Sequence, residues 1–283
     1  MAEIVLSAPE AQRLLDAHRR GQTRLQASPD LNRSRVTVQL LKDGVLWPDG
    51  QRTPWEHLQT VAEHSNAVFV LTPQGPEPIR AYSPLTERVV ALYPTSRAPT
   101  VLLSGIPMHR VQGTDPWRDT QAKVRALRPR GWVLDTCMGL GYSALQAAAT
   151  ADRVLTVEID PAVLEVARRN PWSQPVFQHP RVHIVQADVA TLIQSLPSGF
   201  FSAILHDPPQ FALAGELYGQ DFYAELFRVL KPGGRLFHYV GSPSTRMGRN
   251  MTRGVARRLQ AVGFERIRPV PRAFGILAQR PRT

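Results

Sequence analysis

The residues His206-Asp207-Pro208-Pro209 follow the apolar run FFSAIL at 200–205. Proline has no N–H to donate to a neighbouring strand, so an apolar strand that reaches this point must end there. The Asp207 carboxylate and the fixed backbone carbonyls beside it are acceptors that suit the two N–H bonds of an amine. The chemistry predicted here is the binding and orientation of an amino group.

Three further carboxylates each follow an apolar run: Asp135 after GWVL, Glu158 after RVLTV and Asp188 after VHIVQA. Gly139 and Gly141 then allow a ligand to approach the backbone and lead it to a helix N-terminus. Glu158, seventeen residues beyond Gly141, suits the hydroxyls of a ribose. Asp188 suits an adenine amino group, or caps the helix that follows it, and these two roles are compatible.

The same segments argue against a dinucleotide. The glycine turn contains no lysine of the kind that binds phosphates, and three carboxylates nearby would repel a pyrophosphate. The spacing therefore predicts a site for a neutral or cationic nucleoside.

Such carboxylates share one edge only if their strands are parallel and adjacent. From about Asp115 onward, apolar strand-like runs alternate with helix-like segments, which predicts a mostly parallel sheet covered on both faces. The expected strands are 131–136, 153–159, 182–188, 200–207 and 235–241, and the expected helices are 117–127, 142–150, 161–170, 189–196, 215–230 and 250–263. The runs 264–270 and 274–280 are too close for a crossover and predict an antiparallel hairpin.

The chain before about Pro107 has a different rhythm of short elements separated by prolines. The Ser-x-x-Glu pattern at 7–10 and the Thr-x-x-Glu pattern at 53–56 predict capping boxes before two helices, and 34–47 predicts a hairpin. The sequence thus predicts a small α+β domain over 1–107, a connecting strap and first helix over 108–130, and a Rossmann-like α/β domain over 131–283.

The segments VLDTCMGLGYSAL, VEID, VQAD and HDPP resemble those of class I S-adenosylmethionine-dependent methyltransferases. Cys137 stands where that family usually has its first turn glycine, a substitution that also resembles the aminopropyltransferases of polyamine synthesis. The resemblance implies S-adenosylmethionine as cofactor and no metal. The implied cofactor contacts are Asp135, Thr136, Cys137, Gly139, Gly141, Glu158, Ile159, Asp188 and Val189.

The Asp-Pro-Pro run also resembles the Asp/Asn-Pro-Pro-aromatic motif of enzymes that methylate adenine N6 or cytosine N4. Gln210 occupies the usual aromatic position, and Phe211 comes one residue late. The resemblance implies that Asp207, Pro208 and Pro209 form the catalytic group. His206 either takes part in catalysis by contacting the substrate or has only a structural role. The implied substrate contacts are Gln210, Phe211 and Arg110.

Nearly the whole chain resembles an archaeal-type family of predicted methyltransferases. The segments that carry this resemblance are SGIPMHRVQGTDPWRDT, ILHDPPQFALAGELY and GRLFHYVG. That family is linked to cytidine N4 methylation and dimethylation of ribosomal RNA. The resemblance implies RNA, as ribosomal RNA or the small ribosomal subunit, for a partner and RNA docking for residues 1–107. An aminopropyltransferase, a small-amine N-methyltransferase and a non-catalytic RNA-binding protein remain alternatives.

The charge balance is strongly basic, with a formal net charge of +11 that is almost entirely arginine. Residues 241–283 contain ten arginines and a single acidic residue, Glu265. Such a surface favours a polyanion, although a solvated face explains it as well.

Cys137 is the only cysteine, so no internal disulfide forms, and no membrane span or secretory signal is indicated. We predict a cytoplasmic enzyme; its target base, the number of methyl groups and the oligomeric state stay open.

Overall fold

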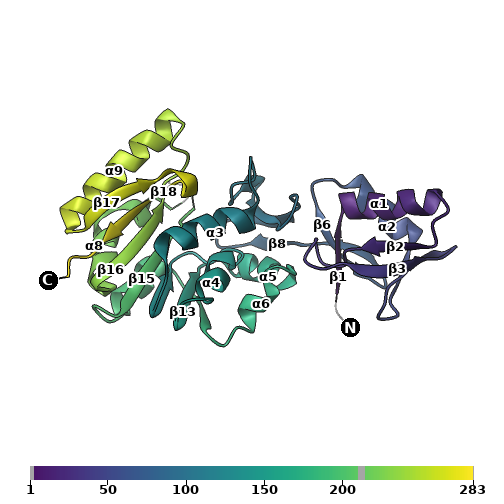
Figure 1. Ribbon diagram of the computed structural model, residues 1–283, viewed down its shortest axis with the longest axis horizontal. Helices are drawn as coiled ribbons and strands as arrows, with labels where there is room; N and C mark the ends of the chain where they lie inside the picture. The colour runs from purple at the N-terminus through teal and green to yellow at the C-terminus, as the bar shows by residue number, and fades with distance from the viewer. Residues whose placement is uncertain (1–2, 210–213, 283) are drawn as a thin grey trace. The chain divides into compact units, whose positions relative to one another are not determined.

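The computed structural model describes residues 3–209 and 214–282. They form two compact units (Figure 1). The first comprises Met1–Trp117 and Ala162–Pro175, and the second comprises Arg118–Pro161 and Val176–Thr283. Residues 108–117, predicted as part of a strap, thus belong to the first unit.

The first unit contains three small antiparallel sheets, with strand orders β1-β6-β7, β2-β3-β4-β5 and β11-β10-β9-β8. Helices α1 and α2 pack against each other, and buried Leu14, Trp47 and Leu58 share one apolar core. Its elements are β1 (Ile4–Ser7), α1 (Ala8–Arg19), β2 (Arg24–Ala27), β3 (Val36–Leu40), β4 (Gly44–Leu46), β5 (Arg52–Pro54), α2 (Trp55–Glu63), β6 (Val68–Thr72), β7 (Gly75–Pro78), β8 (Arg80–Ser83), β9 (Arg88–Tyr93), β10 (Thr100–Leu103) and β11 (Ile106–Pro107).

The two predicted capping boxes are wrong. Ser7 makes no side-chain cap, and the Glu10 carboxylate instead accepts the backbone N–H of Ser28 at 2.7 Å. Helix α2 begins after Pro54, and the buried hydroxyl of Thr53 accepts the indole N–H of Trp47 at 2.9 Å. Glu10 and Thr53 therefore form tertiary hydrogen bonds in place of the capping contacts that the local pattern predicts.

The second unit is built on a sheet with strand order β14-β13-β12-β15-β16-β18-β17. The first five strands run parallel, whereas β18 is antiparallel to both β16 and β17. From residue 116 onward the elements are α3 (Pro116–Leu127), β12 (Trp132–Asp135), α4 (Tyr142–Ala147), β13 (Arg153–Glu158), α5 (Pro161–Arg169), α6 (Gln174–Phe177), β14 (Val182–Gln186), α7 (Val189–Ser195), β15 (Phe201–His206), η1 (Gly215–Tyr218), α8 (Gln220–Val229), β16 (Leu230–Tyr239), α9 (Arg246–Val262), β17 (Glu265–Val270), η2 (Pro271–Ala273) and β18 (Gly275–Gln279).

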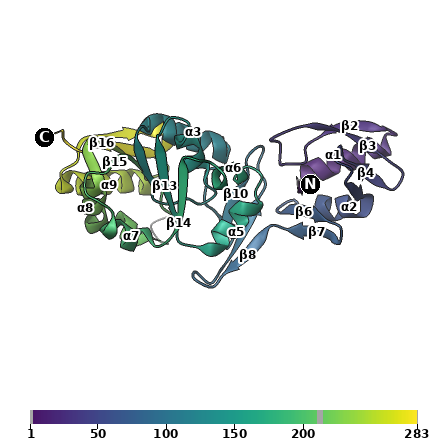
Figure 2. The same cartoon turned by 90° about the horizontal axis from the view of Figure 1, so that it is seen from below.

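Central strands of this sheet are buried on both faces, which explains why they read as continuous apolar runs. Figure 2 shows α3 on one side of the sheet and α7 and α8 on the other. Helix α8 contacts both α7 and α9, and residues of all three helices share a core with β12, β15 and β16. The helix expected over 215–230 is divided at Gly219, whose extended backbone (φ −74°, ψ 156°) separates η1 from α8.

No helix within 3–209 and 214–282 is long and apolar enough to cross a membrane.

Candidate active site

The carboxyl ends of four parallel strands of the second unit meet at one edge of its sheet. These strands are hydrogen-bonded neighbours in the order β14-β13-β12-β15. Each ends in or just before one of the predicted carboxylates: Asp188, Glu158, Asp135 and Asp207, in that order. The structure therefore brings together the four acidic residues that the sequence singles out, at the edge where open α/β sheets bind ligands.

Asp135 is almost fully buried, at 1% exposure. Its Oδ2 accepts hydrogen bonds from the hydroxyls of Ser143 and Thr156, each at 2.8 Å. Its Oδ1 has no hydrogen-bond partner among the residues that the structure describes. Burial raises the pKa of Asp135 to about 7. A buried carboxylate oxygen of this kind suits an ammonium group on a ligand.

The turn after β12 uses its two glycines differently. Gly139 has a φ of 53°, and a Cβ atom there would meet no described atom within 4 Å, so the space beside it is open to a ligand. Gly141 has a φ of 74°, and a Cβ atom there would lie 2.8 Å from Cγ1 of Val176. Gly139 thus admits a ligand, whereas Gly141 serves the packing of the turn.

Cys137 lies in the sequence between Asp135 and Gly139, and it is partly buried. Burial raises the pKa of its thiol well above the usual range. The thiol is therefore protonated near neutral pH and is a poor nucleophile, in keeping with a contact role in the turn.

Glu158 links the turn to β13. Its Oε2 accepts the backbone N–H of Gly139 at 2.8 Å, and its Oε1 accepts that of Asp160 at 3.1 Å. Burial raises the pKa of Glu158 to about 7. The next residue, Ile159, is 45% exposed and presents an apolar surface beside the carboxylate. This pair suits a ribose and a flat ring next to it.

Asp188 caps α7. Its Oδ1 accepts the backbone N–H of Ala190 and its Oδ2 accepts the hydroxyl of Thr191, both at 2.9 Å. Val189, the next residue, is buried. Because Asp188 is exposed and each carboxylate oxygen has a second lone pair, the cap leaves acceptor capacity for an adenine amino group. Contact with adenine stays a prediction.

Asp207 is held by a buried lysine from α3. Nζ of Lys123 lies 2.6 Å from Oδ2 of Asp207, 3.0 Å from Oδ2 of Asp119 and 4.3 Å from the centre of the Tyr239 ring. The side chains of Lys123 and Asp119 are 2% and 0% exposed, whereas that of Asp207 is 22% exposed. Asp207 is therefore the charged member of this group that a ligand can reach.

Burial raises the pKa of Asp207, and the Lys123 ammonium lowers it, with the rise prevailing. Burial lowers the pKa of Lys123, but the carboxylates of Asp207 and Asp119 raise it above its ordinary value. Lys123 is therefore a permanent cation at this edge.

His206 points into the core and has no exposed surface. Its Nε2 lies 2.9 Å from the carbonyl oxygen of Leu217, and its Nδ1 lies 2.7 Å from the hydroxyl of Thr136. A carbonyl only accepts, so Nε2 carries the proton and Nδ1 accepts. Burial lowers the pKa of His206 to about 4, so the ring is neutral near pH 7. These contacts favour its structural role, and a part in catalysis stays a prediction.

The second proline after Asp207 is held from η1. Pro208 is buried, and the carbonyl of Pro209 accepts the hydroxyl of Tyr218 at 2.9 Å. Gln210 and Phe211, the predicted substrate contacts, lie outside the described residues. Arg110 belongs to the first unit, so its predicted contact with substrate also stays a prediction.

Sequence reasoning missed Lys123 and Asp119. Two signals were present: Asp119 precedes Lys123 by four residues on a helix, and lysine occurs at only three positions, Lys42, Lys123 and Lys231, in an arginine-dominated chain. Within the described ranges, no group of three or more His, Cys, Asp or Glu residues is arranged to hold a metal ion.

Residues 133–234 match the family described as a methyltransferase domain. An uncharacterized protein of Methanocaldococcus jannaschii is 44% identical over 187 residues, which cover 65% of each chain. A polyamine aminopropyltransferase of Mycobacterium tuberculosis is 33% identical over 111 residues, covering 37% of this chain and 21% of that protein. Putrescine N-methyltransferase 4 of Nicotiana tabacum is 29% identical over 100 residues, covering 34% and 26%.

Among solved structures, a spermidine synthase in complex with the transition-state analogue AdoDATO superposes with a TM-score of 0.60 at 19% identity, covering 72% of this chain and 74% of that one. The matches span less than two thirds of these sequence relatives' lengths. The second unit contains most of the residues that match the methyltransferase-domain family, and S-adenosylmethionine is the cofactor that this match implies. The buried Oδ1 of Asp135 and the open space at Gly139 fit that cofactor.

Proposed function

We propose that the chain methylates an exocyclic amine of an RNA base, with N4 of cytidine in ribosomal RNA as the first acceptor to test. The observation that carries the proposal is the partly exposed Asp207 carboxylate, which a buried lysine holds at the cofactor edge of the sheet. When bound, S-adenosylmethionine supplies a methyl group on a positively charged sulfur.

The lone pair of an exocyclic base amine is delocalised into the ring, so the amine is a weak nucleophile. Asp207 accepts one of its N–H bonds, and a backbone carbonyl of the following prolines accepts the other. These two contacts aim the lone pair at the cofactor and stabilise the positive charge that develops on nitrogen. Proton loss follows methylation, so no strong base is needed, which agrees with a neutral, buried His206.

The charge of the acceptor site supports a base amine. A base amine is uncharged near pH 7, whereas putrescine and spermidine are polycations. Lys123 places a permanent positive charge 2.6 Å from the carboxylate that would receive the amine. That ammonium partly neutralises Asp207 and repels a cationic substrate.

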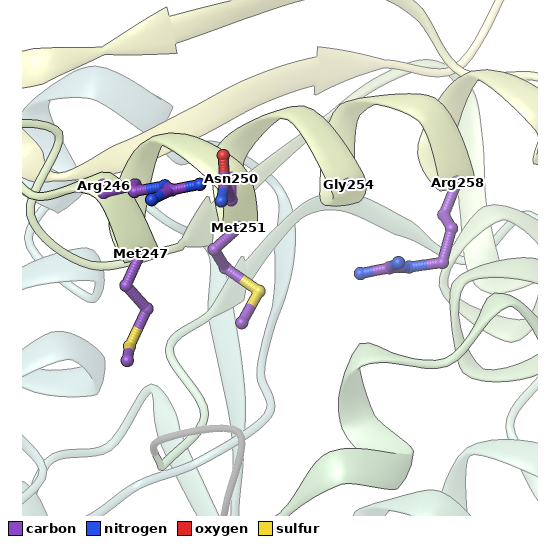
Figure 3. A pocket seen from close by; sticks show the side chains of 6 residues that line it. All are labelled: Arg246, Met247, Asn250, Met251, Gly254 and Arg258. Atoms are coloured by element: carbon purple, nitrogen blue, oxygen red, sulfur yellow. The ribbon is translucent and has the colours of Figure 1, made fainter.

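Helix α9 supports an RNA partner. Its exposed arginines, Arg246, Arg249, Arg253 and Arg257, recur every three or four residues and so follow one side of the helix. Residues of α9 also line an open hollow of about 640 Å³, into which Met247 and Met251 project (Figure 3). Met247 is 79% exposed. Arginines beside the exposed Met247 suit phosphates next to an unstacked base.

A second candidate is transfer to an aliphatic amine, either of a methyl group or, from the decarboxylated cofactor, of an aminopropyl group. The sequence relatives named above favour this candidate, because two of them are named for polyamine or putrescine substrates. The charge of Lys123 and of α9 argues for the first candidate. The two lines of support conflict, and acceptor specificity decides between them.

The test offers the full chain one labelled donor and three acceptors. Methyl-labelled S-adenosylmethionine is mixed with small ribosomal subunits, deproteinised ribosomal RNA or a putrescine–spermidine mixture, and RNA products are digested to nucleosides for mass spectrometry. The RNA comes from cells that lack the gene. A parallel reaction uses decarboxylated donor labelled in its aminopropyl group. We expect label in N4-methylated cytidine, its loss in Asp207→Ala, and its retention in Asp221→Ala, which removes an exposed carboxylate from α8.

Other outcomes assign the chain differently. Label in adenosine keeps the amine mechanism and changes the base. Label in a polyamine, from either donor, overturns the RNA proposal in favour of the second candidate. Methylation of subunits without methylation of free RNA identifies the assembled particle as the substrate.

A further inference from the structure

Lys123 is an unusual lysine for its position. It is 2% exposed, and its ammonium is surrounded by Oδ2 of Asp207, Oδ2 of Asp119 and the face of Tyr239. The side chain reaches from α3 to the residue after β15, across 84 positions of sequence. Lysine is among the residues least often buried, because removing its charge from water is costly unless the charge is compensated.

Two explanations fit a buried ion group. Lys123 either stabilises the packing of α3 on the sheet or controls the ionisation and orientation of the Asp207 carboxylate. Packing alone does not require a buried lysine, since a buried ion pair is often no more stabilising than apolar side chains of similar volume. The exposure pattern favours the second explanation: two members of the group are fully enclosed, and Asp207 alone faces the edge where ligands bind.

We propose that Lys123 is a positioning residue that keeps Asp207 ionised and turned toward the acceptor. By binding Oδ2, it leaves the rest of the carboxylate to accept an N–H bond. This inference rests on the proposed function, because it assigns Asp207 to the acceptor amine. Asp119 has the complementary role of holding Lys123 from behind, through an enclosed carboxylate one helical turn away.

The ionisable groups near Asp207 come from several elements. Lys123 and Asp119 belong to α3, Asp135 ends β12, Cys137 lies in the turn after β12, Tyr218 lies in η1 and Tyr239 in β16. Lys123 is the only cation among those whose charges interact with Asp207 in the described structure. Without it, burial and the Asp119 charge both favour the protonated acid, which accepts hydrogen bonds poorly.

Two variants test this inference because they shift the same titration in opposite directions. Lys123→Met removes the ammonium, and Asp119→Asn removes the competing negative charge. The measurement is kcat/KM for the acceptor against pH at saturating S-adenosylmethionine, which reports ionisation of the free acceptor site. Lys231→Met, at an exposed lysine of β16, is the matched control.

We expect Lys123→Met to move the acid limb of the profile upward by about one pH unit or more, the effect of losing an opposite charge at this distance. Each unit corresponds to a tenfold loss below the limb, with recovery at higher pH. Asp119→Asn moves the limb downward, Lys123→Arg restores most of the wild-type profile, and Lys231→Met leaves it unchanged. Equal loss at every pH in Lys123→Met, or an unshifted limb in Asp119→Asn, overturns the inference.

A readout without catalysis separates this inference from the proposed function. The infrared carboxyl band of Asp207, identified as the difference between each protein and its Asp207→Asn version, reports protonation directly. If Lys123→Met raises the titration of that band and methyl transfer is unaffected, Lys123 controls Asp207 but Asp207 does not serve the acceptor. If the band does not move, the inference itself fails. Asp119→Asn provides the same measurement should Lys123→Met not fold.

Discussion

The two halves of the sheet edge surround their buried carboxylates with different partners. On the cofactor half, Asp135 and Glu158 are enclosed by hydroxyls and backbone N–H groups, and their pKa values rise to about 7. On the acceptor half, Asp207 receives a lysine ammonium at 2.6 Å. Both halves are acidic, but among the residues that the structure describes only the acceptor half has a cation bound to its carboxylate.

Under the proposed function, the difference follows from the charge of what each half would bind. S-adenosylmethionine carries an ammonium and a sulfonium, so it brings the positive charge that the cofactor half lacks. An uncharged base amine brings none, so the acceptor half needs a cation from the protein if its carboxylate is to remain ionised. A polyamine would bring its own positive charge and make Lys123 unnecessary, so the buried lysine beside Asp207 supports the proposal of a neutral acceptor.

The largest expected effect is on the rate of methyl transfer and comes from a substitution at Asp207, in the acceptor half. Asp207→Ala removes the side-chain acceptor of the amine N–H, so we expect methyl transfer to fall by about 10²–10³-fold, the usual cost of losing one preorganised contact in a reacting site. Affinity for S-adenosylmethionine should change by less than about threefold. Single-turnover transfer and calorimetry of cofactor binding measure the two quantities. A parallel loss of cofactor affinity would show that the halves are not separable.

The next largest effect is on cofactor affinity and comes from a substitution at Asp135, in the cofactor half. Asp135→Asn removes the buried carboxylate whose Oδ1 is proposed to receive the cofactor ammonium, so we expect affinity for S-adenosylmethionine to fall by about 100-fold, in the range for losing one partner of a buried charged hydrogen bond. Transfer at saturating cofactor should recover most of its rate. Ser143→Ala is the milder control, because it removes one hydrogen bond to Oδ2 and leaves the charge.

The cofactor half could be predicted from the sequence because its parts are close in the chain. Asp135, the glycine turn and Glu158 lie within two consecutive strand–helix units, and parallel pairing of β12 with β13 brings them together. The ends of buried strands and the glycines of tight turns can be recognised from local sequence patterns, and the fold places them as those patterns predict.

The acceptor half could be predicted only in part. The pattern at Asp207-Pro208-Pro209 predicted the end of β15, but the lysine comes from a helix that precedes the whole sheet. No local periodicity reports which strand end a helical side chain reaches. The capping boxes failed for the same reason, since Glu10 and Thr53 have tertiary partners that local patterns do not contain.

A smaller effect concerns pH and the cofactor half. The pKa values of Asp135 and Glu158 are raised to about 7 by burial, and a cationic ligand favours their ionised forms. Affinity for S-adenosylmethionine should therefore fall as pH falls below 7, by up to about tenfold per unit for each carboxylate coupled to binding. Calorimetry from pH 5.5 to 8.5 measures this dependence, and Asp135→Asn should flatten it.

The stability of the ligand-free protein has the opposite sign. Between the unfolded carboxyl values near 4 and the folded values of about 7, the native state binds more protons through Asp135 and Glu158, so their contribution to stability falls as pH rises. His206 opposes this trend. Its lowered pKa of about 4 makes its contribution fall as pH decreases below the unfolded value near 6.5. Cofactor affinity is therefore the cleaner measurement.

The smallest expected effect on activity concerns the residue between the halves. His206 joins Thr136 of the cofactor turn to Leu217 of η1 through its two ring nitrogens. His206→Phe leaves a buried carbonyl and a buried hydroxyl without that partner, which should lower the free energy of unfolding by about 2–4 kcal/mol. Because the ring is neutral and enclosed, transfer at a temperature where the variant is folded should stay within about threefold of wild type. Urea unfolding and single-turnover transfer test the two parts. A loss of transfer above 100-fold with intact folding and cofactor affinity would instead make His206 part of the chemistry and join the two halves into one catalytic unit.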